Sequence, residues 1–141
     1  MKAPWHLWVI GIVTLIWNAG GAFDYFMTQS QNESYMSNFT AEQLAYFYSF
    51  PTWTNATWAI AVWLAVLGSV LLLMRNSLAL WSYVVSFVGL VLTSVYTYLI
   101  ADVSSIDLMG VGSAVFTLLI FIVSALLIWY ARAMKQRGVL R

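Results

Sequence analysis

The sequence predicts an all-α integral membrane protein, built as an antiparallel bundle of four transmembrane helices in a single domain that covers residues 1–141. Three observations lead to this prediction. The chain is 62% hydrophobic and 8% charged, with a mean hydropathy of +0.84, which is far from the composition of soluble domains. Four apolar runs each approach the roughly 20 residues that a helix needs to cross a bilayer core. All but one of the charged residues lie between these runs or beyond them.

The predicted transmembrane helices are residues 5–27, 53–74, 78–100 and 108–130. The connections 75–77 and 101–107 are short enough for tight antiparallel hairpins. The first connection, 28–52, is long enough to hold structure of its own.

Within that first connection, Thr40 and Gln43 have the spacing of a capping box. We therefore expect a short helix over 41–49, lying on the outer surface with Leu44, Phe47 and Tyr48 as its apolar face. Two roles are open for it. The helix either plugs the top of the bundle or covers an outward-facing cavity.

The charged residues indicate how the chain crosses the membrane. The basic residues occupy the N-terminus, the second connection and the C-terminal tail: Lys2, Arg75, Arg132, Lys135, Arg137 and Arg141. Four of the five acidic residues occupy the first and third connections: Glu33, Glu42, Asp102 and Asp107. The positive-inside rule then predicts that both termini are cytoplasmic.

The first predicted helix contains the polar stretch "WNAGGAFDY". Trp17 and Asp24 lie along one helical stripe, and Asn18 and Tyr25 lie along the adjoining stripe. Unpaired polar groups are costly in hydrocarbon, so this face must meet protein or water. The small run 19–22 predicts that Gly20 and Gly21 let a neighbouring helix approach closely. Which of the two stripes faces open space is not decided by the sequence.

The third predicted helix carries a stripe of small and polar residues, namely Ser82, Ser86, Gly89, Thr93 and Tyr96. The fourth shows a sparser version, and Trp63 of the second lies far from either interface. The hydroxyl groups either form hydrogen bonds between helices or line a polar cavity. If the hydroxyl groups line a polar cavity, the candidate solute-binding residues are Trp17, Asn18, Asp24, Trp63, Ser86, Thr93 and Tyr96.

Several kinds of chemistry are excluded by composition. There is no cysteine, and His6 is the single histidine, which excludes thiol chemistry, paired-histidine haem ligation and histidine-rich zinc sites. Catalysis would depend on Asp24 alone, so we expect no enzyme activity, no cofactor and no metal. Six scattered basic residues and a net charge of +1 argue against a nucleic-acid partner.

Three segments, "PWHLW", "WNAGGAFDYFMT" and "FTAEQLAYFYSFPTW", resemble a family of small four-span bacterial inner-membrane proteins. Some members carry the automatic label "sugar transporter". The resemblance implies a bacterial inner-membrane location and a small polar solute such as a sugar. No family site residues can be placed on this chain, which lacks the Pro-Gln pair of the well-known three-helix sugar transporters.

Two functional hypotheses follow. In the first, the protein transports or binds a small polar solute and forms a homo-oligomer, because four short helices enclose little volume. In the second, it is an accessory or assembly subunit of a larger membrane protein complex, where the polar stripes bind helices together. In both, the lipid bilayer surrounds the chain.

Overall fold

The computed structural model describes residues 3–101 and 105–141. Throughout these ranges the regular structure is helical, which confirms the predicted fold class. The elements are α1 (Trp5–Gln29), α2 (Glu33–Met36), α3 (Ala41–Tyr48), α4 (Thr52–Leu73), α5 (Leu78–Val95), the π-helical turn η1 (Tyr96–Ile100), α6 (Ser105–Met109) and α7 (Val111–Gln136). Four helices are long and apolar enough to span a membrane: α1, α4, α5 with η1, and α7. The chain is thus built as a small integral membrane protein.

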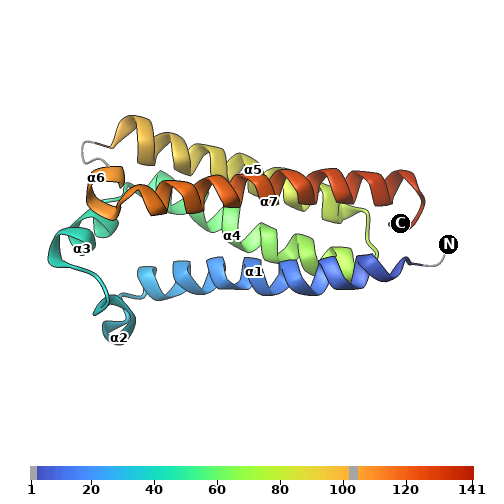
Figure 1. Ribbon diagram of the computed structural model, residues 1–141, viewed down its shortest axis with the longest axis horizontal. Coiled ribbons are helices and arrows are strands. Elements are labelled where there is room, and N and C mark those ends of the chain that lie inside the picture. Colours follow the sequence, from blue (N-terminus) through green and yellow to red (C-terminus); the bar gives the residue numbers. More distant parts are fainter. Residues whose placement is uncertain (1–2, 102–104) are drawn as a thin grey trace.

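The four long helices run side by side (Figure 1). We call the end where α1 begins and α7 finishes the terminal end, and the opposite end, where α2, α3 and α6 gather, the loop end. Lys2 and Asp102 lie outside the described residues, as does part of the predicted hairpin over 101–107.

The main apolar core lies at the terminal end. Buried side chains from all four long helices and the C-terminal tail meet there, among them Leu7, Leu72, Tyr83, Leu127, Ala131, Met134 and Val139. The tail is held against the α4–α5 connection, because the Arg141 N–H donates to the Arg75 carbonyl at 2.9 Å and the Ser77 N–H donates to the Arg141 carbonyl at 3.0 Å. His6 Nδ1 and the Tyr130 hydroxyl are hydrogen-bonded at 2.5 Å. Helices α1 and α7 are therefore joined at this end.

Helices α4 and α5 pack closely along the small stripe of α5. A side chain at Gly89 would meet the Thr57 carbonyl oxygen of α4 at 2.7 Å, and one at Gly68 would meet the Tyr83 ring at 2.6 Å. The Ser82 hydroxyl donates to the Leu64 carbonyl at 2.6 Å. Close approach of backbones is the usual role of glycine in membrane helices.

The prediction that Gly20 and Gly21 admit a neighbouring helix was wrong. A Cβ at Gly20 would meet nothing within 4 Å, and one at Gly21 would make only an ordinary contact with Val62. On α1 the close approach occurs at Gly11, beside Leu73. A glycine permits close approach of a neighbouring helix, but the position of that helix decides at which glycine the approach occurs.

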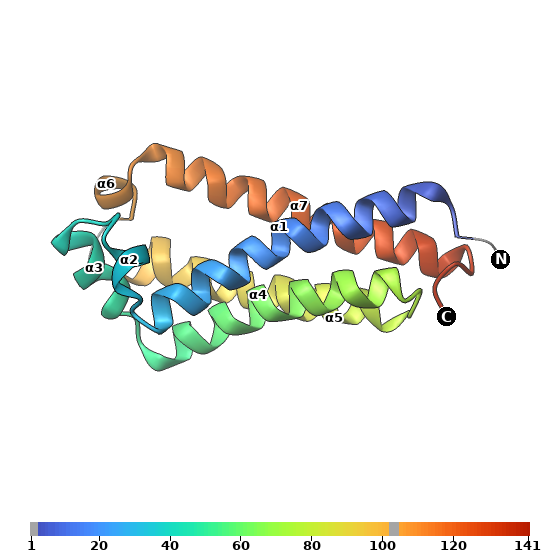
Figure 2. The same cartoon turned by 90° about the horizontal axis from the view of Figure 1, so that it is seen from below.

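Helix α7 separates from α1 toward the loop end, as the rotated view shows (Figure 2). Its start differs from the prediction, in which the fourth span began at residue 108. Gly110 has φ +89°, a left-handed conformation that ends the short helix α6 and allows α7 to begin at Val111. The sequence did not reveal this break because the apolar pattern continues through it.

The capping box at α3 is confirmed, with the Thr40 and Gln43 side chains each bonded to the other's backbone N–H. The predicted apolar face was partly wrong, since Tyr48 is exposed and Tyr46 is buried. Tyr46 packs edge-on against Phe50, which in turn contacts Tyr96 at the end of α5. Helix α3 therefore docks through a different face from the one that periodicity favoured.

Candidate functional site

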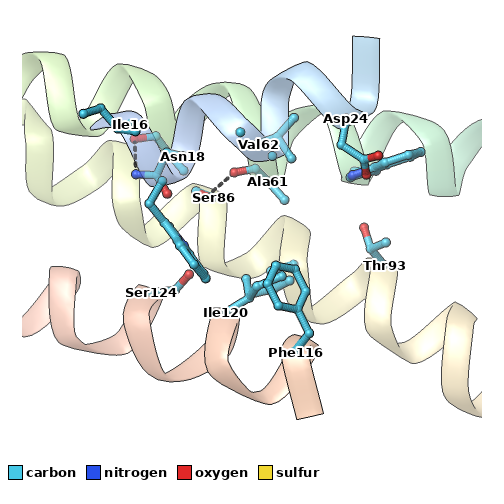
Figure 3. Close-up of a pocket in the computed structure, with 16 residues that line it drawn as sticks. Ile16, Asn18, Asp24, Ala61, Val62, Ser86, Thr93, Phe116, Ile120 and Ser124 are labelled. Atoms are coloured by element: carbon cyan, nitrogen blue, oxygen red, sulfur yellow. Dashed lines mark hydrogen bonds between the residues drawn. The ribbon is translucent and has the colours of Figure 1, made fainter. Parts of the chain in front are cut away.

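A cavity of about 660 Å³ lies between α1, α4, α5 and α7, in the region where α7 leaves α1 (Figure 2). This volume is in the range of small-molecule sites. Its walls are mostly apolar, with a few polar groups among them. The lining residues are Ile16, Trp17, Asn18, Gly20, Gly21, Asp24, Trp58, Ala61, Val62, Ala65, Ser86, Leu90, Thr93, Phe116, Ile120 and Ser124. Asn18 and Asp24 lie toward opposite ends of the cavity, and Phe116 and Ile120 reach into it from α7 (Figure 3).

Five of the seven residues proposed from the sequence line this cavity together: Trp17, Asn18, Asp24, Ser86 and Thr93. The other two do not. Trp63 is 47% exposed on another face of α4, and Tyr96 packs between Phe50 and Trp53.

Trp58, rather than Trp63, supplies the tryptophan of α4. The two are five residues apart, which at about 100° per residue places them well round the helix from each other. Trp58 shares its stripe with Ala61 and Ala65, which also line the cavity. This i, i+3, i+7 run of one aromatic and two small residues is the sequence signal that could have identified it.

The structure also shows which stripe of α1 faces the cavity. Trp17 and Asp24 both line it, together with Asn18, whereas Tyr25 does not. The Tyr25 ring packs edge-on against Trp58, with ring centroids 5.0 Å apart. Tyr25 thus supports the cavity wall from behind.

Asn18 is held by a polar network in the middle of the bundle. Its Nδ2 donates to the Ala65 carbonyl and to Ser69 Oγ, both at 3.1 Å. Ser69, which is fully buried, also bonds Thr14 at 3.0 Å and the Tyr83 hydroxyl at 2.8 Å. Three helices meet at this one hydroxyl.

The hydrogens of this network can be assigned by counting donors. Thr14 donates its only hydroxyl hydrogen to the Ile10 carbonyl at 2.6 Å, so Ser69 must donate to Thr14. Tyr83 and Asn18 then donate to Ser69. Both amide hydrogens of Asn18 are used, and its Oδ1 accepts no hydrogen bond from any residue that the structure describes.

The α5 hydroxyls that line the cavity also donate their hydrogens to backbone carbonyls. Ser86 donates to Ala61 on α4, and Thr93 donates to Gly89 on its own helix at 2.8 Å. Thr93 also bonds the Thr57 hydroxyl at 2.8 Å. What these two side chains present to the cavity is therefore the oxygen lone pair.

Asp24 is bonded by a residue that the sequence prediction missed. Tyr35 of α2 donates its hydroxyl to Asp24 Oδ1, and α2 is fixed by the Asn32 side chain, which accepts from the Tyr35 backbone N–H at 3.1 Å. Burial, then the hydrogen bond to Asp24 and its negative charge, raise the pKa of Tyr35 to about 12. Tyr35 therefore stays protonated and acts as a donor at neutral pH.

Comparison with known proteins gives no match: no family model, no curated protein and no solved structure is similar to this chain.

Proposed function

We propose that the protein binds a small polar solute in the cavity and transports it across the membrane. The cavity itself carries this proposal. Helices that only packed against one another would bury Asn18 and Asp24 between side chains, whereas here both line about 660 Å³ of space together with Ser86 and Thr93. A sugar is one such solute, as the resemblance to the four-span family implies.

We further propose that the loop end faces outward and both termini face the cytoplasm of a bacterium, with the chain in the inner membrane. The described basic residues support this orientation, because all five lie at the terminal end or in the α4–α5 connection: Arg75, Arg132, Lys135, Arg137 and Arg141. The cavity would then be closest to the outside, where α7 departs from α1 (Figure 2). In a homo-oligomer, neighbouring copies would pack against one another through α7, whose outer face is apolar and exposed.

The test is solute binding and uptake in proteoliposomes, measured over a panel of small solutes. We expect Asn18→Leu to impair binding, because it removes the amide from the cavity, and Trp63→Ala to leave binding unchanged, because Trp63 lies elsewhere. Equal binding by wild type and both variants would contradict a site in this cavity.

A second candidate function is an accessory or assembly subunit of a membrane complex. Its support is that the α5 hydroxyls Ser82 and Ser86 bond carbonyls of α4, as expected of polar groups that hold helices together. Purification in a mild detergent distinguishes the two. Co-purification of a stoichiometric second protein favours the accessory role, whereas recovery as a monomer or homo-oligomer argues against it.

A further inference from the structure

We propose that the solute is a small organic cation, an amine or quaternary ammonium group on an apolar body, and that Asp24 is its counter-ion. This inference rests on the proposed function and narrows its substrate class. Its starting point is the charge of the cavity. Among the described lining residues, Asp24 is the single ionisable one, and the described basic residues lie toward the other end of the bundle.

The surroundings of Asp24 leave its charge uncompensated. Tyr35 donates to Oδ1, but this is a neutral hydroxyl, and no described residue donates to Oδ2. A carboxylate in a membrane-embedded cavity is stabilised strongly by an opposite charge, because the low dielectric strengthens attraction. An anionic solute would instead be repelled.

The hydrogen-bonding capacity of the cavity points the same way. Asn18 Oδ1 is free to accept, while the amide hydrogens of Asn18 and the hydroxyl hydrogens of Ser86 and Thr93 are already donated. Among the lining hydroxyls of the described chain, Ser124 alone has no hydrogen-bond partner. The side chains of Asn18, Asp24, Ser86 and Thr93 thus present acceptors to the cavity, which suit a ligand that donates hydrogen bonds or carries positive charge.

The aromatic walls complete the site. Trp17 and Phe116 approach each other with ring centroids 5.7 Å apart, and Trp58 lines the cavity from α4. Aromatic faces attract cations, most strongly when the cation is desolvated. The remaining wall of Val62, Leu90 and Ile120 would accommodate an apolar body.

The experiment compares three probes with the full chain in nanodiscs of neutral phosphatidylcholine, with binding measured by calorimetry against protein-free nanodiscs. The probes are benzyltrimethylammonium, its uncharged isostere neopentylbenzene, and glucose. We expect the cation to bind at least about tenfold more tightly than the isostere, as one close charge pair in a desolvated site implies. Asp24→Asn should remove this advantage, and Asp24→Glu should retain it.

A filling variant separates the two proposals. Gly20 faces open space in the cavity, so Gly20→Phe should block any occupant whatever its charge. Cation binding that is equal to isostere binding, absent, or insensitive to Asp24→Asn overturns the cationic substrate class. In that case, glucose binding that Gly20→Phe abolishes would still support the proposed function. Probe binding that Gly20→Phe leaves intact would place the site elsewhere and overturn both.

Discussion

The Tyr35 hydroxyl, on a one-turn helix outside the membrane spans, donates a hydrogen bond to the Asp24 carboxylate on α1. It connects the loop between the first two spans to the single acidic residue of the cavity. The loop end is thus coupled to the candidate site through one side chain.

The pKa of Tyr35 is expected to respond to Asp24. Because it is raised from 10.0 to about 12 in the folded chain, the protonated hydroxyl stabilises the fold below pH 10. That contribution is lost as the pH rises from 10 to 12. Asp24→Asn removes the charge, so the pKa should fall toward 10 without reaching it, since burial remains the largest cause. The pKa of Tyr35 is measured from tyrosinate absorbance, as the difference between the titration of the chain and that of its Tyr35→Phe variant. An unchanged pKa of Tyr35 in Asp24→Asn would contradict the contact.

Gly89→Ala should destabilise the bundle. The added methyl group would lie 2.7 Å from the Thr57 carbonyl oxygen and 3.0 Å from the Ala61 nitrogen, and backbone atoms cannot move aside as a side chain can. We expect a loss of about 1–3 kcal/mol, measured by unfolding in detergent. Gly20→Ala is the matched control, because its methyl group meets open space. Equal stability of the two variants would show that α4 and α5 are not so closely packed.

Ser69→Ala should also destabilise the bundle, because it breaks three side-chain hydrogen bonds and leaves the buried Tyr83 hydroxyl without its Ser69 partner. The expected loss is about 1–3 kcal/mol, by the same unfolding measurement. Ser124→Ala, at a cavity serine without a side-chain partner among the described residues, should change stability by less than about 0.5 kcal/mol. A reversed order would contradict the network.

Trp58→Ala should weaken binding of the cationic probe about fivefold or more, because it removes an aromatic face worth about 1 kcal/mol or more to a desolvated cation. Trp63→Ala, on another face of the same helix, should bind the probe like the wild type. Calorimetry in nanodiscs compares them. A larger effect at Trp63 would restore the assignment made from sequence and place the solute outside the cavity.

The orientation can be tested with single cysteines, because the chain has none of its own. The two variants are Ser34→Cys and Gln136→Cys. Ser34 lies at the loop end and Gln136 at the terminal end, and both are exposed. A membrane-impermeant maleimide added to intact spheroplasts should label the first and should label the second only after lysis. The opposite pattern would reverse the proposed topology.

The sequence predicted the fold because the bilayer imposes a length and a composition on every spanning helix. All four spans were identified in this way, whereas the α3 capping box was identified from the local spacing of Thr40 and Gln43. The same physics placed Asn18 and Asp24 on a face that must avoid lipid. Local signals fail where the apolar pattern does not change, so the break at Gly110 was missed. The helix α2 was missed because four residues are too few to show a periodic pattern.

Only the tertiary structure decided how the predicted faces are used. The small stripe of α5 has both proposed roles, since Ser82 and Gly89 pack against α4 while Ser86 and Thr93 also line the cavity. Whether the space beside a glycine is occupied by a neighbouring helix, as at Gly89, or open, as at Gly20, depends on the rotation and crossing of helices distant in sequence. Likewise, the run of Trp58, Ala61 and Ala65 can be read in the sequence, but only the packing of α4 against its neighbours shows that this face, and not that of Trp63, lines the cavity.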